Sequence, residues 1–250
     1  MKPIFVKEWH GIPLNSIKGF VKNKIPGEEF YSNFYEKFFE AHQTWDDLDP
    51  DWVDHKINSA KFIGSRLKGA KRVLSIGCGV GIIEKYLLEE GVKGLEIQEV
   101  SEEPLRWIRT LFATEAVHIG GVPDCLSLSG KYDYIFLSVV DYCFEEEAYV
   151  GFLSEIRDLL SSNGRCLVIT PTIHFSKFEW AEIKFWMKFK LKTLISFPGF
   201  YDLGQLVGWR RDQNEFQNAL ISAGFKVSEK GFLGQDAMFS KTFWIEGVRD

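Results

Sequence analysis

The sequence has few cysteines, and none of them are spaced for a covalent or metal-bound scaffold. It contains only four, and no two form a CxxC pair. Because a disulfide framework or a zinc site needs paired or clustered cysteines, the sequence indicates neither. Each cysteine lies among apolar or small residues, which predicts buried, reduced thiols. The four are Cys78, Cys125, Cys143 and Cys166.

Long apolar runs and an excess of positive charge are also missing. No stretch approaches the roughly 18 apolar residues of a membrane-spanning helix, and the first residues lack the continuous apolar segment of a signal peptide. We therefore expect a soluble, cytoplasmic protein. The 30 Lys and Arg residues face 35 Asp and Glu, a formal net charge of −5. This acidic balance disfavours nucleic acid as a partner, because non-specific binding depends on neutralising phosphates.

Aromatic residues, in contrast, are abundant, and the apolar pattern changes along the chain. Apolar residues at helical spacing predict helices between residues 28 and 69, with Asp49 and Pro50 as the cap and first turn of the second. From residue 72, short apolar strands alternate with amphipathic helices, including helices predicted over residues 102–112 and 145–164. This alternation predicts an α/β fold, with a parallel sheet covered by helices on both faces.

Residues 172–210 interrupt this alternation. They are aromatic and basic, and they are too long for an ordinary connection between a strand and a helix. The pattern then resumes with a helix and two strands that have no helix between them, which predicts an antiparallel pair. We therefore divide the chain into an N-terminal helical cap, residues 1–69, and an α/β domain, residues 70–250, with a cap insertion at 172–210.

A glycine-rich turn joins the first strand of the α/β pattern to its first helix. In "VLSIGCGVGIIEKYL", residues 73–87, the strand ends in Gly77, Gly79 and Gly81. Glycines let the backbone turn tightly and approach a ligand, and free N–H groups at the helix start face its anionic part. The dinucleotide fingerprint GxGxxG needs a glycine where this chain has Ile82. The spacing GxGxG therefore argues against a dinucleotide.

The same residues resemble the first motif of the class I S-adenosylmethionine-dependent methyltransferases, a strand ending in E/DxGxGxG. The resemblance extends over residues 70–170 and, in outline, over 210–250. It implies a doubly wound, seven-stranded, mostly parallel sheet whose last strand is antiparallel, with the N-terminal helical cap and the insertion after strand five. It also implies S-adenosyl-L-methionine as cofactor and S-adenosyl-L-homocysteine as product.

This family places an acid at the end of the second strand, where it accepts hydrogen bonds from both ribose hydroxyls. Glu99, 20 residues after Gly79, is the match, and Glu96 is the weaker alternative. A carboxylate suits a vicinal diol because it offers several acceptor lone pairs and no donor.

The adenine ring is expected beside Gly120 and Gly121, where Val122 offers an apolar wall and Asp124 can replace an acid that is common in the family. The cofactor contacts that the resemblance implies are Ser75, Gly77, Cys78, Gly79, Gly81, Glu99, Val100, Val122 and Ser138.

Ser75 departs from the family pattern. The family usually has Asp or Glu there, which helps to hold the glycine loop and the amino end of the cofactor. A serine still hydrogen-bonds backbone but brings no charge to balance an ammonium group. Three alternatives follow: weaker cofactor binding, a contact supplied by another acid, or a domain that binds the cofactor without turnover.

The acceptor site is expected at the ends of strands four and five. Asp141 and Tyr142 follow strand four, where they orient an acceptor hydroxyl or, in the case of Asp141, cap the next helix. His174 follows strand five and is a candidate base because its ordinary pKa lies near neutrality. The motifs of exocyclic-nitrogen and cytosine-C5 methyltransferases are absent, and no Asp-Asn pair follows strand five, so we expect no metal.

The two caps are expected to border this site. On a helical wheel, residues 175–195 form a lysine stripe and an aromatic stripe, which fit a packed cap, a pocket wall or a basic amphipathic helix on an anionic membrane. Arg210 and Arg211 either meet an anionic group of the acceptor or lie in solvent. Four N-terminal side chains either close over the cofactor or pack between helices: Tyr31, Tyr35, His42 and Trp45.

Together these features predict methyl transfer to a small molecule or to a glycan or lipid-linked acceptor, at oxygen rather than nitrogen. The alternatives are an RNA or protein methyltransferase and a non-catalytic module that binds the cofactor.

Overall fold

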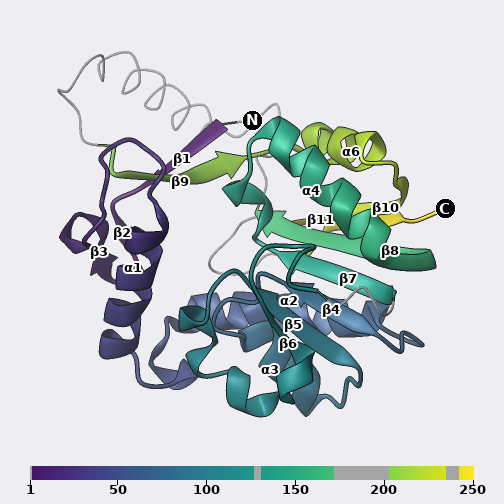
Figure 1. The fold of residues 1–250 in the computed structure, drawn as a ribbon, viewed down its shortest axis with the longest axis horizontal. Helices are drawn as coiled ribbons and strands as arrows, with labels where there is room; N and C mark the ends of the chain where they lie inside the picture. Colours follow the sequence, from purple (N-terminus) through teal and green to yellow (C-terminus); the bar gives the residue numbers. More distant parts are fainter. Residues whose placement is uncertain (1, 127–130, 172–202, 235–241) are drawn as a thin grey trace.

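The computed structural model describes residues 2–126, 131–171, 203–234 and 242–250, and its centre is a seven-stranded sheet (Figure 1). The strand order is β10-β11-β8-β7-β4-β5-β6, and β11 is antiparallel to both of its neighbours. The other neighbouring pairs are parallel, which confirms the predicted fold class. The strands are β4 (Val73–Ile76), β5 (Leu95–Glu99), β6 (Val117–Ile119), β7 (Tyr132–Ser138), β8 (Leu160–Pro171), β10 (Lys226–Phe232) and β11 (Thr242–Val248).

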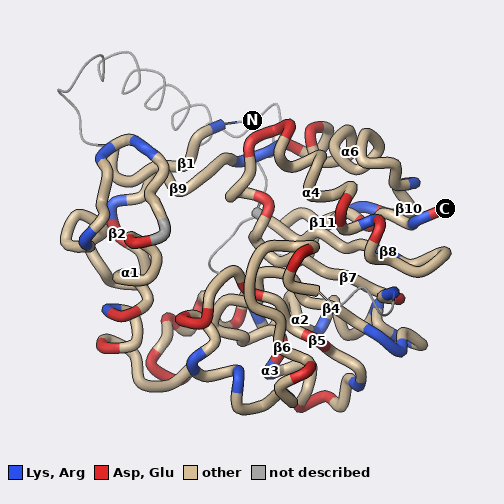
Figure 2. Tube along the Cα trace, in the orientation of Figure 1, with Lys and Arg blue, Asp and Glu red and all other residues tan. Residues whose placement is uncertain are grey.

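Helices cover both faces of the sheet because its strands are apolar on both sides. On one face α4 (Glu146–Leu159) and α6 (Gln213–Ser222) pack against residues such as Ile135 and Val168. On the other, α2 (Pro50–Arg66) and α3 (Ile82–Glu89) pack against alternate residues, among them Phe136 and Leu167. Figure 2 shows the charged residues mostly on the loops and outer helices, while the central strands carry few. The period of two along each strand thus assigns every side chain to one of two cores.

The N-terminal segment forms a cap that joins the sheet domain through a small second sheet. Strand β1 (Lys2–Val6) pairs antiparallel with β9 (Gln205–Arg210), the end of the predicted insertion (Figure 1). The cap also contains β2 (Glu8–Trp9), β3 (Ile12–Pro13) and α1 (Glu28–Ala41), whose aromatic face is buried. Sequence periodicity predicted the helices but not these strands, because β1 and β9 pair with each other from opposite ends of the chain. Residues 172–202 of the insertion lie outside the described residues.

The predicted helix caps are partly confirmed. The Asp49 carboxylate accepts from the Trp52 N–H at 3.1 Å, and Pro50 begins α2. At the start of α6, Asp212 and Glu215 form a reciprocal capping box.

Two predicted helices differ from the structure. Residues 102–112 form two 3₁₀ turns, η3 (Glu103–Arg106) and η4 (Arg109–Leu111), rather than one helix. Short turns suffice to bury Leu105 and Ile108, which produced the helical spacing. Helix α4 ends at Leu159 instead of near Gly164, because Leu160 already pairs with Tyr132 in the sheet. The remaining 3₁₀ turns are η1 (Leu14–Ser16), η2 (Trp45–Asp47), η5 (Thr114–Ala116) and η6 (Asp141–Cys143).

A polar network around Glu96 joins β5, β6 and β7. Glu96 Oε1 accepts from Arg72 Nε at 2.6 Å. Glu96 Oε2 accepts from the Tyr132 hydroxyl at 2.8 Å and lies 2.7 Å from His118 Nε2. Although burial opposes ionisation, the hydrogen bonds from His118, Arg72 and Tyr132 lower the pKa of Glu96 to about 2. Its ionised form therefore stabilises the fold.

We expect Glu96→Gln to lower the free energy of unfolding at pH 7 by roughly 2–3 kcal/mol. Because the folded-state pKa lies below the ordinary 4.5, this contribution is complete above about pH 4.5 and is lost as pH falls towards 2. Urea unfolding of parent and variant at pH 7 and pH 3 measures it. The exposed Lys85–Glu89 pair supplies a control, since Glu89→Gln should change stability by less than about 0.5 kcal/mol. Equal unfolding midpoints for Glu96→Gln and its parent would contradict a stabilising network.

Candidate functional site

The glycine loop lies at the carboxyl end of β4, where the chain turns into α3. Gly77, Gly79 and Gly81 have φ values of 66°, 56° and 77°, a region that favours glycine. A Cβ at Gly77 would lie 2.5 Å from Val140, and one at Gly81 would lie 2.4 Å from Ile108. At Gly79 a Cβ would meet nothing within 4 Å. The outer glycines are therefore needed for packing, while the middle one borders open space.

Two side chains that sequence reasoning did not single out hold this loop in place. Gln98 is buried; its Oε1 accepts from the Gly77 N–H at 3.2 Å, and its Nε2 donates to the Gly120 carbonyl at 2.7 Å. From the cap, the Trp45 indole donates to the Val80 carbonyl at 2.9 Å. Trp45 was a candidate for closing over the site, and its indole N–H instead fixes the main chain of the loop at Val80. The position of Gln98, at a strand end beside an acid, was the one sequence signal for its role.

Glu99, at the end of β5, points its carboxylate at the same loop. Oε2 accepts from the Gly79 N–H at 2.9 Å and Oε1 from the Val100 N–H at 2.8 Å. Burial raises the pKa of Glu99, while these two backbone hydrogen bonds oppose the rise. Each oxygen retains a lone pair, so the carboxylate can accept two further hydrogen bonds. The alternative, Glu96, has its oxygens engaged in the network that joins the strands.

Ser75 and Ser138 lie one step below the loop, on the face of the sheet that α2 and α3 cover. The Ser75 hydroxyl donates to Glu84 Oε1 at 2.5 Å, and both side chains are buried. Lys56, from α2, donates to the Ser138 hydroxyl at 3.3 Å. Sequence reasoning identified both serines but neither of their charged partners.

The other residues expected to contact a cofactor surround the loop less closely. Cys78 is half-buried, and its Sγ lies 3.8 Å from the Gly79 carbonyl. The Val100 side chain is 69% exposed, so its main contribution is its N–H to Glu99. Val122 is half-buried against the core beneath α4, and Asp124 is exposed.

Asp141 and Tyr142 form η6, directly after β7. The Asp141 carboxylate is buried and hydrogen-bonded by Thr170, and its Oδ1 has no hydrogen-bond partner within the described residues. Burial raises the pKa of Asp141 to about 6, against the opposing effects of Thr170 and Arg211. The proposal that Asp141 caps the next helix is wrong: α4 has Glu145 at its N-cap and no side-chain cap bond.

Strand β9 packs directly against this turn. The Gly208 Cα approaches the Tyr142 main chain so closely that a Cβ at Gly208 would overlap the Tyr142 carbonyl. Arg211 is fully buried; Nη1 donates to the Asp141 carbonyl at 2.6 Å and Nη2 to the Phe144 carbonyl at 2.5 Å. Of the two alternatives given for Arg211, a position in solvent is wrong, since its guanidinium is buried and holds the backbone of the turn.

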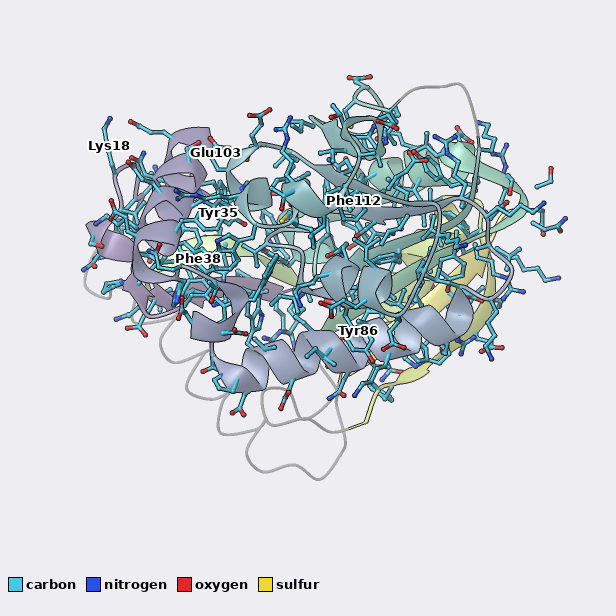
Figure 3. All side chains as sticks on the ribbon, turned by 90° about the horizontal axis from the view of Figure 1, so that it is seen from below. Lys18, Tyr35, Phe38, Tyr86, Glu103 and Phe112 are labelled. Atoms are coloured by element: carbon cyan, nitrogen blue, oxygen red, sulfur yellow. The ribbon has the colours of Figure 1, made fainter. Side chains whose placement is uncertain are left out.

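Helix α1 brings two tyrosines to the same end of the sheet. Figure 3 labels Tyr35 on α1, and Ser32 on the same helix donates to Glu103 at 3.0 Å. The charges of Glu99 and Cys78 act on the Tyr35 hydroxyl, whose pKa is raised chiefly by burial. Burial raises the pKa of Tyr31 to about 12. The prediction of a buried thiol is wrong for Cys143, which is exposed because it lies in the turn η6. Cys143 acts electrostatically on both tyrosines. These side chains are thus crowded together at an accessible surface between the cap and the turn after β7.

His42, the fourth cap residue, is half-buried and packs within the cap, where its ring contacts Phe38. Its ring nitrogens lie 3.2 Å from the Asp47 carbonyl and 3.3 Å from the His10 carbonyl. His174 and residues 175–195 lie outside the described residues, as do the lysine and aromatic stripes. Within the described part of the chain, His, Cys, Asp and Glu side chains form no cluster of three that could hold a metal ion. Nor does any helix found there have both the length and the apolar composition for crossing a membrane.

Three glycine variants test how the loop is built. Gly79→Ala should cost about 1–2 kcal/mol, the penalty of a left-handed backbone alone. Gly81→Ala should cost about 3 kcal/mol or more, because Ile108 must also move. Gly121→Ala, whose φ is not positive and whose Cβ meets nothing within 4 Å, is the matched control. Thermal unfolding measures the order; equal losses for Gly79→Ala and Gly81→Ala would show that Ile108 does not restrict the loop.

The fold of this chain recurs among solved methyltransferases. Magnesium protoporphyrin IX methyltransferase from Synechocystis PCC 6803, solved with bound SAH, aligns with a TM-score of 0.59 and 17% identity over 86% of this chain and 93% of that one. The mitomycin 7-O-methyltransferase MmcR aligns with a TM-score of 0.58 and 17% identity, over 89% of this chain and 57% of its own. Human N-acetylserotonin methyltransferase, solved in complex with SAM, aligns with a TM-score of 0.52 and 16% identity, over 89% of this chain and 56% of its own.

No curated protein matches the chain in sequence. Residues 55–229, well over half of the chain, match the methyltransferase domain family. This span runs from α2 through the glycine loop and the turn after β7 to β10, so it contains the glycine loop, Glu99 and the turn with Asp141 and Tyr142, whereas Trp45 and the tyrosines of α1 lie before it. The chain therefore belongs to the class I S-adenosylmethionine-dependent methyltransferases.

Proposed function

We propose that this protein transfers a methyl group from S-adenosylmethionine to a hydroxyl group of a small molecule or of a glycan or lipid-linked acceptor. The cofactor supplies an electrophilic methyl group. The observation that carries the proposal is the Glu99 carboxylate, fixed by two backbone N–H groups beside the open space at Gly79. An anchored acceptor of this kind, at the carboxyl end of a parallel strand, suits a ribose diol.

The other cofactor contacts follow from the same placement. Gly77, Gly79 and Gly81 keep the loop bare, and Cys78 and Val100 flank it. Val122 would form one wall of the adenine site, while Ser75 and Ser138 lie towards the opposite end of the loop with their charged partners.

The acceptor side is proposed to be the accessible surface between α1 and the turn after β7. Asp141 is suited to receive a proton because its carboxylate, with its pKa raised to about 6, is ionised near neutral pH and has one unpartnered oxygen among the described residues. Tyr142 holds its proton because burial raises its pKa well above the usual value, so it serves as a hydrogen-bond donor. His174, at the start of the insertion, remains a predicted alternative base.

The two caps complete this proposal. We assign the acceptor boundary to residues 1–69 and to the insertion 172–210 of the domain 70–250, because β1 and β9 join them into one sheet. Methylation at oxygen is supported by the name of one structural neighbour, the mitomycin 7-O-methyltransferase. A cytoplasmic location and a peripheral membrane contact through residues 175–195 remain predictions.

Glu99→Gln tests the ribose assignment. The amide keeps the shape but replaces one acceptor oxygen with a donor, so we expect at least a tenfold loss of affinity for S-adenosylhomocysteine, about 1.4 kcal/mol. Isothermal titration calorimetry measures it. Glu102→Gln, at an exposed neighbouring acid, should bind like the parent. Unchanged affinity in Glu99→Gln would refute the assignment.

Asp141→Asn and Tyr142→Phe test the acceptor side, with formation of S-adenosylhomocysteine followed across a panel of phenols, sugars and other hydroxyl compounds. If Asp141 receives the proton, Asp141→Asn should lower kcat by about 10²–10⁴-fold and leave cofactor affinity unchanged. Tyr142→Phe should chiefly raise the KM for the acceptor. Turnover at the parental rate in Asp141→Asn would remove Asp141 from the mechanism, and turnover on RNA or protein alone would favour the competing acceptor classes.

A further inference from the structure

The strand before the glycine loop lacks an acid at Ser75, but a carboxylate from helix α3 lies beside that position. Ser75 stands where the strand would carry a carboxylate, and its hydroxyl donates to Glu84 Oε1 at 2.5 Å. Glu84 lies in the first turn of α3, three residues after Gly81, and is 2% exposed. Helix α3 and the Ser75 side chain share one face of the sheet, which lets an acid on the helix reach the position below the loop.

The second oxygen of this carboxylate is unusual. Glu84 Oε2 is buried and has no hydrogen-bond partner among the residues described. A buried carboxylate oxygen without a partner is costly and is retained where it has a use. Ser75 fixes one oxygen and so determines where the other points.

A positive charge is held near the carboxylate without neutralising it directly. Lys56 acts on Glu84 electrostatically and favours its ionised form. The Lys56 ammonium donates instead to Ser138 at the end of β7, and it lies 5.9 Å from the centre of the Trp52 ring. A buried acid on α3 and a half-buried lysine on α2 thus lie on the same face of the sheet as Ser75 and Ser138, to which they are hydrogen-bonded.

We propose that Glu84 and Lys56 together recognise the amino-acid end of S-adenosylmethionine, with Glu84 accepting from the α-ammonium group and Lys56 attracting the α-carboxylate. This inference rests on the proposed placement of the cofactor in the glycine loop. A zwitterion matches a separated acid and base better than either charge alone, because each cofactor charge then meets its opposite. In this arrangement Ser75 positions Glu84, and Glu84 on helix α3 takes the role that an acid on the strand has elsewhere in the family.

Three ligands separate the two contacts. S-adenosylmethionine has both charged groups, decarboxylated S-adenosylmethionine has only the amine, and 5′-methylthioadenosine has neither. In calorimetric titrations Glu84→Gln should weaken S-adenosylmethionine and its decarboxylated form at least tenfold and leave 5′-methylthioadenosine unchanged. Lys56→Met should weaken only S-adenosylmethionine. Glu89→Gln on α3 and Lys61→Met on α2, both exposed, are the matched controls and should change none of the three.

The pattern across ligands distinguishes this proposal from its rivals. An equal loss for all three ligands in Glu84→Gln would show that the residue only shapes the loop, and no loss for any would show that it makes no contact; either overturns the proposal. If the parent binds none of the three, the placement of the cofactor itself fails. Glu99→Gln should weaken all three alike, because each contains the ribose.

A swap variant keeps the test independent of folding defects. Ser75→Asp combined with Glu84→Ser returns the acid to the strand, where the family usually has it. We expect Glu84→Ser alone to lose affinity for S-adenosylmethionine and its decarboxylated form, and the double variant to recover most of it. Failure of the double variant to recover, with a parental melting temperature, would overturn the exchange of positions.

The pH dependence gives an independent readout. Burial raises the pKa of Glu84 to about 7, and the charge of Glu99 adds to the rise. The hydrogen bond from Ser75 and the charge of Lys56 oppose it. The charge of Glu84 in turn helps to raise the pKa of the neighbouring Cys78. A protonated Glu84 cannot pair with an ammonium group, so affinity for decarboxylated S-adenosylmethionine should fall as pH drops from 8 to 6. Glu84→Gln should remove this fall, and a fall of the same size in Glu84→Gln would count against the assignment.

Discussion

The structure depends on a short stretch of backbone that must stay left-handed and bare between β4 and α3. Gly77 and Gly81 have no room for a Cβ beside Val140 and Ile108, so packing enforces what the glycines allow. The N–H groups of Gly77 and Gly79 are bound by Gln98 and Glu99 from the next strand. Because both anchors belong to β5, the register between β4 and β5 sets the geometry of the whole site.

The cap is coupled to this loop through hydrogen bonds rather than through apolar packing alone. The Trp45 indole donates to the Val80 carbonyl of the loop, and α1 brings Tyr31 and Tyr35 to the accessible surface beside the turn after β7. On the far side of the site, Arg211 follows β9 and holds the turn after β7 by two main-chain carbonyls. Since β9 pairs with β1, the first strand of the cap and the last strand of the insertion frame the turn that carries Asp141 and Tyr142. A displacement of β1 or β9 can therefore alter the position of Asp141 and Tyr142 without a direct contact to the glycine loop.

The success of sequence reasoning varied with the range of the interactions involved. Alternating apolar strands and helices predicted the sheet, and the strand-glycine-helix order placed the loop, because both signals are local. The helix predicted over 102–112 was wrong because buried Leu105 and Ile108 have the same spacing in two short turns. Ser75 was recognised as a departure, but Glu84 was not found as its partner, since the two come together only when α3 packs on β4.

The sequence by itself determined the fold class and the bare loop, because periodicity, glycine spacing and chain order are properties of neighbouring residues. Glu99 was expected to lie beside this loop from the resemblance to the family. Only the tertiary structure decided which side chains hold that loop, the end of β7 and the turn after it. Gln98, Trp45, Lys56 and Arg211 act from different elements, and their roles follow from which face and which strand end each one occupies. Charges separated along the chain acquire a joint function once burial removes water and leaves each with few alternative partners.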